Sequence, residues 1–152
     1  MLSGLVATIR GYALEAGRQS WGDMTANKKT VELYMEGFRR SDHAMVLSCL
    51  TGDVEWLIPG VFHVHGKEAF DKEIENEAFV GSPVIVVTRM VEEADVIFAE
   101  GTVRAQRRDG GTLNLMFCDA FEMQSGKIRK LTSYLMEVTR PQDTAETAPT
   151  HP

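Results

Sequence analysis

Residues 96–138, VIFAEGTVRAQRRDGGTLNLMFCDAFEMQSGKIRKLTSYLMEV, decide the fold class of this 152-residue chain. Apolar and polar residues alternate along three long segments, and turn signals separate these segments at Asp109-Gly110-Gly111 and at Ser125-Gly126. A period of two residues is typical of a β-strand with one buried face. The pattern therefore predicts antiparallel hairpins with strands at 96–107, 112–123 and 127–138.

Three more strands are predicted upstream of this block. A fourth long strand at 84–92 precedes the turn Glu93-Ala94-Asp95, and it extends the run of hairpins. Two shorter strands are predicted earlier in the chain. The first spans 53–58 and stops at Pro59-Gly60, and the second spans 61–65.

Three helices are predicted between residues 24 and 80. The first would be capped by Thr25 or Asn27, and its apolar face is Val31, Tyr34, Met35 and Phe38. Ser41-Asp42 would cap a second, short helix that carries Met45, Val46, Leu47 and Leu50. Gly66 would open a third, with an apolar stripe of Phe70, Ile74 and Ala78. Helices first and antiparallel strands last predict an α+β layout.

The composition bounds the class of protein. With 43% hydrophobic and 25% charged residues, the chain has the balance of one globular domain. The net charge of −6 argues against a nucleic-acid partner. No apolar run is long enough to cross a membrane, and the first residues lack the basic start of a secretory signal. Cys49 and Cys118 match no metal-ligand spacing and predict reduced thiols in a cytoplasmic protein.

The two ends of the chain differ from the middle. Residues 1–23 predict either an extra N-terminal helix or a mis-assigned start, with the native start at Met24. Residues 140–152 are rich in proline and threonine and hold no large apolar side chain, so we expect a disordered tail. The expected domain is therefore 24–139.

Short motifs along residues 26–138 resemble a known family. They occur in the order Val31-Glu32-Leu33-Tyr34, Asp53-Val54-Glu55-Trp56, Gly66-Lys67-Glu68-Ala69-Phe70, Cys118-Asp119-Ala120-Phe121, Gly126-Lys127-Ile128 and Ser133-Tyr134. Their order and spacing resemble the NTF2-like superfamily, in particular its SnoaL-like and ketosteroid-isomerase-like members. The resemblance implies a cone of three helices on a strongly curved, mainly antiparallel sheet. It also implies a deep apolar pocket for a small molecule and a homodimer formed through the sheet.

The resemblance also implies a chemistry at named positions. In ketosteroid-isomerase-like members, a tyrosine and an acid bind a developing oxyanion, and these positions match Tyr34 and Asp119. The family's general base corresponds to Ile58, which cannot accept a proton. An arginine and a second aspartate of the limonene-epoxide-hydrolase pattern correspond to Phe117 and Ser133. The SnoaL polyketide cyclase pattern, with one acid at Asp119 and a histidine nearby, therefore fits this chain better than either of the other two.

Asp119 is also the sharpest feature of the residue pattern itself. It shares one face of its predicted strand with Leu115, Phe117, Phe121 and Met123. A lone acid in an apolar row is costly unless it is paired or neutral, and desolvation would raise its pKa. This pattern predicts a general acid or hydrogen-bond donor, and the alternative is a structural acid bonded to a tyrosine, a histidine or water.

His63 and His65 are the candidate bases near neutral pH. Their spacing puts both rings on one face of a strand, and His63 would supply the missing base as a third catalytic residue beside Asp119 and Tyr34. The alternative is a position at the pocket rim or in solvent. A His-x-His pair without a third ligand is a weak metal signal, so we expect no metal site.

The pocket is expected to be lined from the helices and from both ends of the sheet. The expected ligand-pocket residues are Trp56, Ile58, His65, Phe70, Phe117, Phe121, Leu131, Ser133 and Leu135. Ordinary core packing is the alternative for Trp56, Ile58, Leu131, Ser133 and Leu135.

Three functions from different classes fit this sequence. The first is a cofactor-free isomerase, cyclase or dehydratase that acts on an apolar carbonyl compound through Asp119 and Tyr34. The second is a non-catalytic binder of a hydrophobic ligand, which the loss of the base at Ile58 favours. The third is a dimeric scaffold, for which the small residues Ala99, Gly101, Val103 and Ala105 would allow close packing of the sheet.

Overall fold

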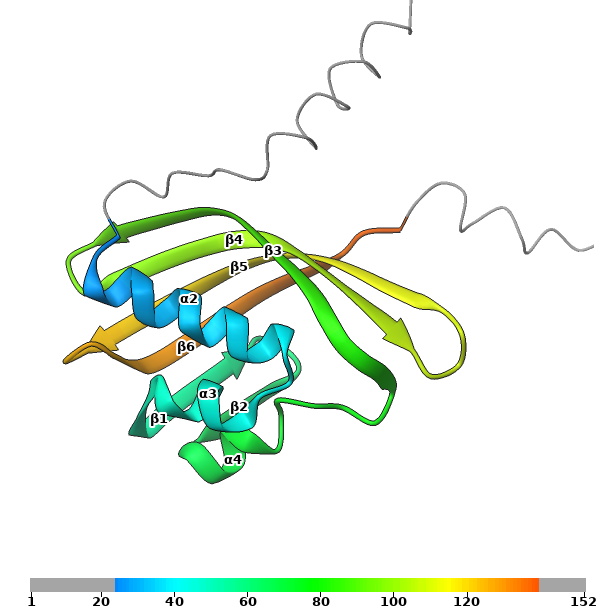
Figure 1. Cartoon of the computed structure of the whole chain (residues 1–152), viewed down its shortest axis with the longest axis horizontal. Helices are drawn as coiled ribbons and strands as arrows, with labels where there is room; N and C mark the ends of the chain where they lie inside the picture. The colour runs from blue at the N-terminus through cyan, green and yellow to red at the C-terminus, as the bar shows by residue number, and fades with distance from the viewer. Residues whose placement is uncertain (1–23, 140–152) are drawn as a thin grey trace, which may run out of the picture.

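A computed structural model describes residues 24–139 (Figure 1). The expected N-terminal extension and the expected disordered tail lie outside these residues. In chain order, the described residues form α2 (Ala26–Arg39), α3 (His43–Ser48), β1 (Leu50–Ile58), β2 (Phe62–His65), α4 (Lys67–Asp71), β3 (Phe79–Glu93), β4 (Val96–Arg107), β5 (Thr112–Gln124) and β6 (Lys127–Glu137).

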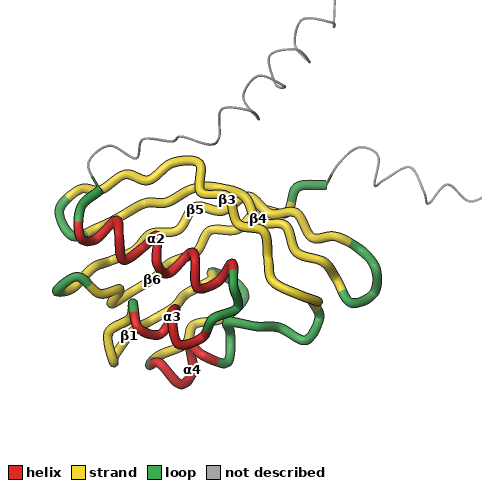
Figure 2. Tube along the Cα trace, viewed as in Figure 1, coloured by secondary structure: helices red, strands yellow, loops and turns green. Residues whose placement is uncertain are grey.

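The strands form one curved sheet in the order β2-β1-β6-β5-β4-β3. β1 runs parallel to β6, and the other neighbouring strands are antiparallel. The helices gather on one side of this sheet, and α2 lies across the long strands (Figure 2). This arrangement confirms the expected α+β class, with helices packed on a strongly curved and mainly antiparallel sheet. Within residues 24–139, no helix is both long and apolar enough to span a membrane.

The predicted helix starts are confirmed for α2 and α3. The Thr25 hydroxyl accepts a hydrogen bond from the backbone N–H of Lys28, at 3.1 Å, and caps α2. Asp42 caps α3 by accepting from the N–H of Met45, at 2.9 Å. Gly37 lies where α2 and α3 meet. A Cβ atom at this position would come within 2.7 Å of a methyl group of Val46, so a larger residue would not fit. Glycine lets α3 pack directly against α2.

The long strands begin and end close to their predicted limits, except for the start of β3. This strand begins at Phe79 rather than at residue 84, and it contains Pro83. The pairing of β3 with β4 shifts register between Val80 and Val84, around the proline. Proline has no N–H to donate, and it is tolerated here because β3 is an edge strand.

Two of the helix predictions are wrong at their C-terminal ends. The third helix was expected to run through Ala78, but α4 ends at Asp71. A helix that continued to Ala78 would carry Glu75 and Glu77 in its last turn, where the helix dipole disfavours them, and the side chain of Asn76 instead accepts a hydrogen bond from the backbone N–H of Ala78 at 2.8 Å. Leu50 does not end the second helix but begins β1, where it pairs with Ile128 of β6.

The small residues of β4 face the helices rather than the outer side of the sheet. Ala99 and Gly101 are buried, whereas Phe98 and Thr102 on either side of this stretch are exposed. A Cβ atom at Gly101 would lie 2.0 Å from the backbone oxygen of Val86, where β3 passes close by. The suggestion that these residues allow close packing of an outer sheet face is therefore wrong, because the alternation of β4 turns them inward.

Candidate functional site

A cavity of about 220 Å³ lies between α2 and the inner face of the sheet. Apart from Asp119, Ser133 and the Tyr34 hydroxyl, its lining is apolar, and it is built from α2 and from every strand except β2: Tyr34, Met35, Phe38, Trp56, Ile58, Pro83, Ile85, Val103, Leu115, Phe117, Asp119, Ser133 and Leu135. An empty apolar cavity of about 150 Å³ accommodates benzene. The space here fits a compact molecule of one or two rings.

The cavity continues into a wider groove. This groove has a volume of about 490 Å³ and shares Pro83, Val103 and Leu115 with the cavity. It extends toward Glu73, after α4, and toward Arg108, after β4. A ligand with a longer substituent could therefore leave its ring in the cavity and its polar end in the groove.

Asp119 is the acid of this cavity. It lies on the inward face of β5, directly opposite Ser133 of β6, and only 8% of it is exposed. Burial raises its pKa to about 7, against the lowering effect of a hydrogen bond from the Ser133 hydroxyl. Its Oδ1 atom is buried and has no hydrogen-bond partner among the described residues. Near neutral pH the carboxyl can therefore take or give a proton, and one oxygen is free for a ligand.

A short relay of hydrogen bonds orients this carboxyl. The indole N–H of Trp56 donates to the Ser133 hydroxyl oxygen at 3.0 Å. With its oxygen occupied as an acceptor, Ser133 can direct its own O–H toward Asp119. The Trp56 ring is held in turn by stacking on Phe70, with a centroid distance of 4.7 Å. These contacts hold the Asp119 side chain in one rotamer.

Tyr34 supplies a neutral phenol to the same cavity. Burial, and then the charges of Asp119 and Cys49, raise its pKa well above the usual value. Its ring packs edge-on against Phe121, at a centroid distance of 5.4 Å, and against Phe38 at 5.0 Å. Among the described residues no hydrogen bond joins its hydroxyl to Asp119. Both polar groups thus remain able to bind a third group between them.

The two histidines do not reach the cavity. In β2 the inward side chains are Phe62 and Val64, and the alternation of the strand turns His63 and His65 to the exposed outer face. His63 bonds to Glu55 there, with 3.1 Å between Nε2 and Oε2. The structure therefore places neither His63, the expected base, nor His65, an expected pocket residue, in the cavity with Asp119.

Three other expected pocket residues belong to the packed core. Phe70, Phe121 and Leu131 are completely buried, and none of them lines the cavity. They lie among the neighbours of Tyr34 and Trp56 and hold these rings in place. These three side chains are part of the packed core rather than of the cavity lining.

Sequence reasoning missed other lining residues. Phe38 follows Tyr34 by one helical turn, and Leu115 shares the face of Asp119, so both carried a signal in their spacing. Met35 lies beside Tyr34 on the same helix. Val103 shares the face of Ala99 and Gly101 and so carried a signal too, whereas the places of Pro83 and Ile85 depend on how β3 packs against α2.

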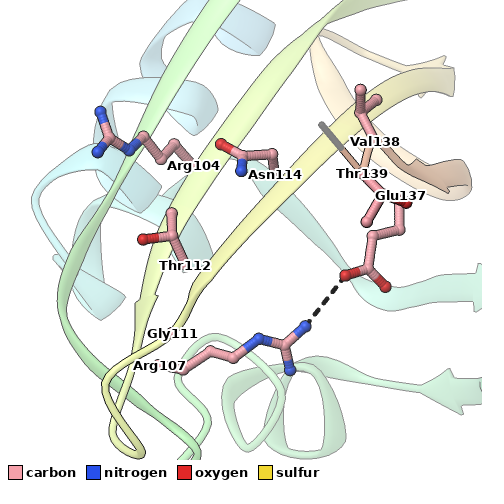
Figure 3. A pocket seen from close by; sticks show the side chains of 8 residues that line it. All are labelled: Arg104, Arg107, Gly111, Thr112, Asn114, Glu137, Val138 and Thr139. Carbon is pink, nitrogen blue, oxygen red and sulfur yellow. Dashed lines mark hydrogen bonds and ion pairs between the residues drawn. The ribbon is translucent and has the colours of Figure 1, made fainter. Parts of the chain in front are cut away.

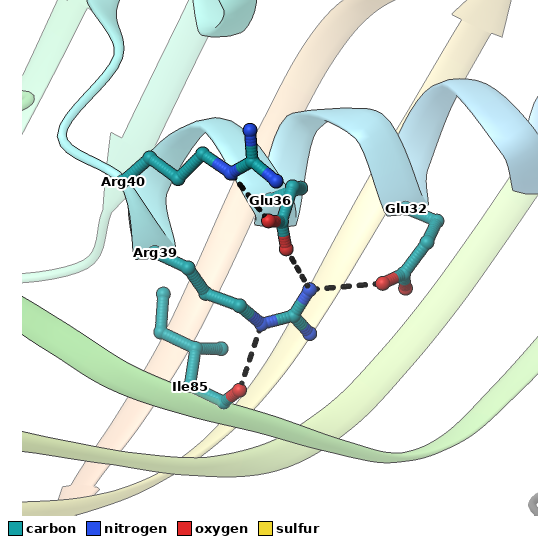
Figure 4. Close-up of polar contacts among 5 residues, drawn as sticks. All are labelled: Glu32, Glu36, Arg39, Arg40 and Ile85. Atoms are coloured by element: carbon teal, nitrogen blue, oxygen red, sulfur yellow. Dashed lines mark hydrogen bonds and ion pairs between the residues drawn. The ribbon is translucent and has the colours of Figure 1, made fainter.

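The Arg39 side chain joins α2 to the cavity wall on β3 through a hydrogen bond and two ion pairs (Figure 4). The Nε atom of Arg39 donates to the backbone oxygen of Ile85 at 2.9 Å, and its Nη1 atom donates to Glu32 at 2.9 Å and to Glu36 at 3.2 Å. Since Ile85 lines the cavity, the hydrogen bond from Arg39 holds this part of β3 close to α2.

A second cavity, of about 420 Å³, lies at the β4–β5 hairpin and the end of β6 (Figure 3). It contains Arg104 and Arg107, and Arg107 donates to Glu137 at 3.2 Å. This cavity is larger than the one at Asp119, but its acid is exposed and already paired with an arginine. The cavity at Asp119 is the better candidate because it holds a buried acid with an unpartnered oxygen.

Comparisons with known proteins agree with this fold. Residues 31–131 match the family model of the SnoaL-like domain. Among curated proteins, no match was found. The chain is similar in structure to TerC crystallised with polyporic acid, with 22% identity, a TM-score of 0.66, and coverage of 72% of this chain and 90% of that one.

Two further structures have the same fold. One is an NTF2-like protein from Burkholderia pseudomallei K96243, with 23% identity, a TM-score of 0.67, and coverage of 74% of this chain and 92% of that one. The other is an epoxide hydrolase from M. tuberculosis of the LEH-like type, with 17% identity, a TM-score of 0.65, and coverage of 73% and 83% respectively. At these identities the likeness establishes the fold.

Proposed function

Since the chain belongs to the family of SnoaL-like domains, we propose that its cavity binds an apolar carbonyl compound and that Asp119 and Tyr34 move a proton on it. The reaction class is isomerisation, cyclisation or dehydration. The observation that carries this proposal is the buried Asp119 carboxyl, which lines an apolar cavity with one oxygen unpartnered.

The proton transfer follows from the two polar groups. The Asp119 carboxylate takes a proton from the carbon next to the carbonyl, and the C–H electron pair forms the enolate, with its charge on oxygen. The Tyr34 hydroxyl donates a hydrogen bond to that oxygen and so stabilises the charge in a site with little water. In an isomerisation, Asp119 then returns the same proton to another carbon, so the reaction needs no co-reactant.

One acid must do both transfers in this scheme. The resemblance to ketosteroid-isomerase-like members puts Ile58 at the position of their general base, and among the described lining residues Asp119 and Tyr34 are the ionisable ones. A catalytic group is most efficient when its pKa lies near the working pH, and the pKa of Asp119 is about 7. Both protonation states are therefore populated at neutral pH, as a shuttle requires.

The second candidate function is a non-catalytic binder, and Ile58 is the observation that favours it. The same cavity would then hold a ligand whose hydroxyl or carbonyl oxygen bonds to Asp119. TerC, a protein of this fold that was crystallised with polyporic acid, supports a role in binding a small organic molecule.

Two measurements test the proposal and separate these candidates. The first is binding of 2-naphthol, a two-ring mimic of an enolate, to the wild type, Asp119→Asn and Tyr34→Phe across pH. We expect Tyr34→Phe to bind it at least about tenfold more weakly, as for a lost hydrogen bond to a charged group, and Asp119→Asn to lose the change in binding that the wild type shows near pH 7. The second is exchange of the α-protons of 2-tetralone in D₂O, followed by NMR. Binding with exchange supports the enzyme, and binding without exchange supports the binder.

Indifference of naphthol binding to both substitutions would overturn the site. Leu33→Glu is a control for these experiments, because Leu33 is an exposed apolar residue of α2 outside the cavity lining. It should leave naphthol binding and proton exchange unchanged.

A homodimer through the outer sheet face is the partner that we propose. Met136 on this face is 68% exposed. Four neighbouring strands contribute the exposed large side chains of the face, which are Val84, Val86, Phe98, Met116, Tyr134 and Met136. An apolar patch of this kind on the outer face of a sheet can pair with its own copy about a two-fold axis. We expect sedimentation to give a dimer for the wild type and Leu33→Glu, and a monomer for Met136→Glu with Met116→Glu. A monomeric wild type would overturn the dimer.

A further inference from the structure

Three side chains that can bind a metal stand together on the outer face of β1 and β2. Glu55 is directly opposite His65 in the antiparallel register, and His63 lies two residues before His65. Alternate residues of a strand share a face. Trp56, next to Glu55 on β1, faces the cavity, so Glu55, His63 and His65 all point away from it. The pairing of the strands thus supplies the third ligand that the His-x-His sequence lacks.

The distances fit a single ion. One ligand atom from each of the three side chains lies within 4.8 Å of the other two. The Nε2 atom of His63 is 3.1 Å from the Oε2 atom of Glu55, and the two imidazole centroids are 4.3 Å apart. Around a tetrahedral zinc ion with bonds of about 2.1 Å, neighbouring ligand atoms are about 3.4 Å apart. One pair is already close to that spacing, and rotation of exposed side chains brings in the third.

We propose that Glu55, His63 and His65 bind a divalent first-row transition-metal ion such as Zn²⁺. Two imidazoles and one carboxylate suit zinc and its first-row neighbours, whereas Ca²⁺ and Mg²⁺ require more oxygen ligands. The three ligands leave a position open to solvent. This site is independent of the proposed function, because it lies on the opposite side of the sheet.

The neighbouring charges tune the site. Lys130 of β6 is paired with Glu55 in the parallel register, and its ammonium group competes with a metal ion for the carboxylate. Glu122 draws part of that charge away, with 3.9 Å between the Lys130 Nζ and the Glu122 carboxylate. Replacement of Lys130 by a neutral residue should therefore tighten metal binding.

A second histidine–carboxylate cluster serves as the matched control. His43 binds Asp71 through Nδ1, at 2.6 Å, and Glu75 through Nε2, at 2.9 Å. The two ring nitrogens lie on different edges of the imidazole, so the two carboxylates cannot share one ion with it. This cluster has the same chemical groups as the first but lacks a convergent geometry.

The test is a titration of the metal-free full-length protein with Co²⁺, followed by its visible absorption, and then by competition with Zn²⁺. We expect one saturable site per chain. Glu55→Gln, His63→Ala and His65→Ala should each weaken binding at least about tenfold, since even loss of an outer-shell partner costs about 10- to 100-fold. His43→Ala and His151→Ala should bind as the wild type does, and Lys130→Gln should bind more tightly.

A second readout does not depend on the cobalt spectrum. An ion held by both strands ties the edge strand β2 to β1, so Zn²⁺ should raise the melting temperature of the wild type and of His43→Ala, but not that of His63→Ala. Circular dichroism checks that each variant is folded. Absence of a saturable site would overturn the proposal. Equal weakening by His43→Ala or His151→Ala would also overturn it, because these histidines lie outside the proposed ligand set.

Discussion

Asp119 and Glu55 are carboxyl groups on opposite faces of one sheet, and their surroundings shift their pKa values in opposite directions. Asp119 faces the cavity, where burial raises its pKa to about 7. Glu55 faces outward, where the hydrogen bond with His63 lowers its pKa. Strand alternation decides which face each acid occupies, and the face then decides the protonation state.

This difference teaches that the location of an acid, more than its residue type, sets its possible chemistry. The inner acid has a serine as its partner and one free oxygen, so it can exchange a proton with a ligand at neutral pH. The outer acid stays ionised beside two imidazoles, which is the state that a cation requires. The inner face is therefore suited to proton transfer and the outer face to metal binding.

The strongest test of the comparison is the rate of proton exchange in Asp119→Asn. General acid–base groups contribute about 10²- to 10⁴-fold, so the exchange of 2-tetralone should fall by about 10³-fold. In the wild type the rate should rise as the pH passes through about 7, because the ionised carboxyl is the base. A wild-type rate that is flat between pH 5 and 9 would remove Asp119 from the reaction.

The second test is the dependence of stability on pH. The folded state holds the Asp119 proton more tightly than the unfolded chain, so the free energy of unfolding should fall as the pH rises from about 4 to about 7. At 1.36 kcal/mol per pKa unit, the loss is on the order of 4 kcal/mol, and Asp119→Asn should recover it above pH 7. Urea unfolding at pH 5 and pH 8 measures about 2.7 kcal/mol of this loss, because about two of the pKa units lie between pH 5 and pH 7.

The control for this measurement is Asp53→Asn. Asp53 is an exposed aspartate of β1 in the same sheet. Its replacement should leave the dependence of stability on pH as it is in the wild type. If both variants changed that dependence equally, burial of Asp119 would not be its cause.

The third test concerns the hydrogen bond that holds the inner acid. Ser133 lowers the pKa of Asp119, so Ser133→Ala should raise it. A hydrogen bond to a charged group contributes about 1.5–3 kcal/mol, and the exchange profile should therefore move to higher pH by about one unit or more. A profile that kept its midpoint while the overall rate fell would show that Ser133 acts only through packing.

The smallest expected effect extends the comparison to two neighbouring arginines of α2. The Arg39 side chain is 25% exposed and bonds to the backbone of β3, whereas the Arg40 side chain is 63% exposed and bonds within the helix. Arg39→Met should lower the free energy of unfolding by about 1–2 kcal/mol, and Arg40→Met by less than about 0.5 kcal/mol. Urea unfolding of the two variants compares them directly, and equal losses would mean that the bond to Ile85 is not what holds β3.

Much of the fold was predictable because it depends on local periodicity. The alternation from Val96 onward, the hairpin turns and the caps at Thr25 and Asp42 all correspond to observed features. The inward direction of Asp119 follows from the same alternation. The end of α4 was not predictable from its apolar stripe, because Asn76 and the acids after Asp71 compete with the helix.

The candidate site was predictable only in part. Tyr34, Trp56, Ile58, Phe117, Asp119, Ser133 and Leu135 were expected together and line one cavity. Phe70, Phe121 and Leu131 share the same apolar pattern but fill the core. Residue type and spacing do not distinguish a side chain that borders a void from one that fills it, since both are apolar and inward.

The sequence by itself determined the class of the fold, the faces of the long strands and the presence of an acid in an apolar row. Periodicity carries this information because it reflects which side of an element meets water. Only the tertiary structure decided that His63 and His65 lie outside, that Glu55 joins them, and that a void remains beside Asp119. These features depend on strand register and on how far β3 bends over α2, and both result from contacts between residues far apart in the chain.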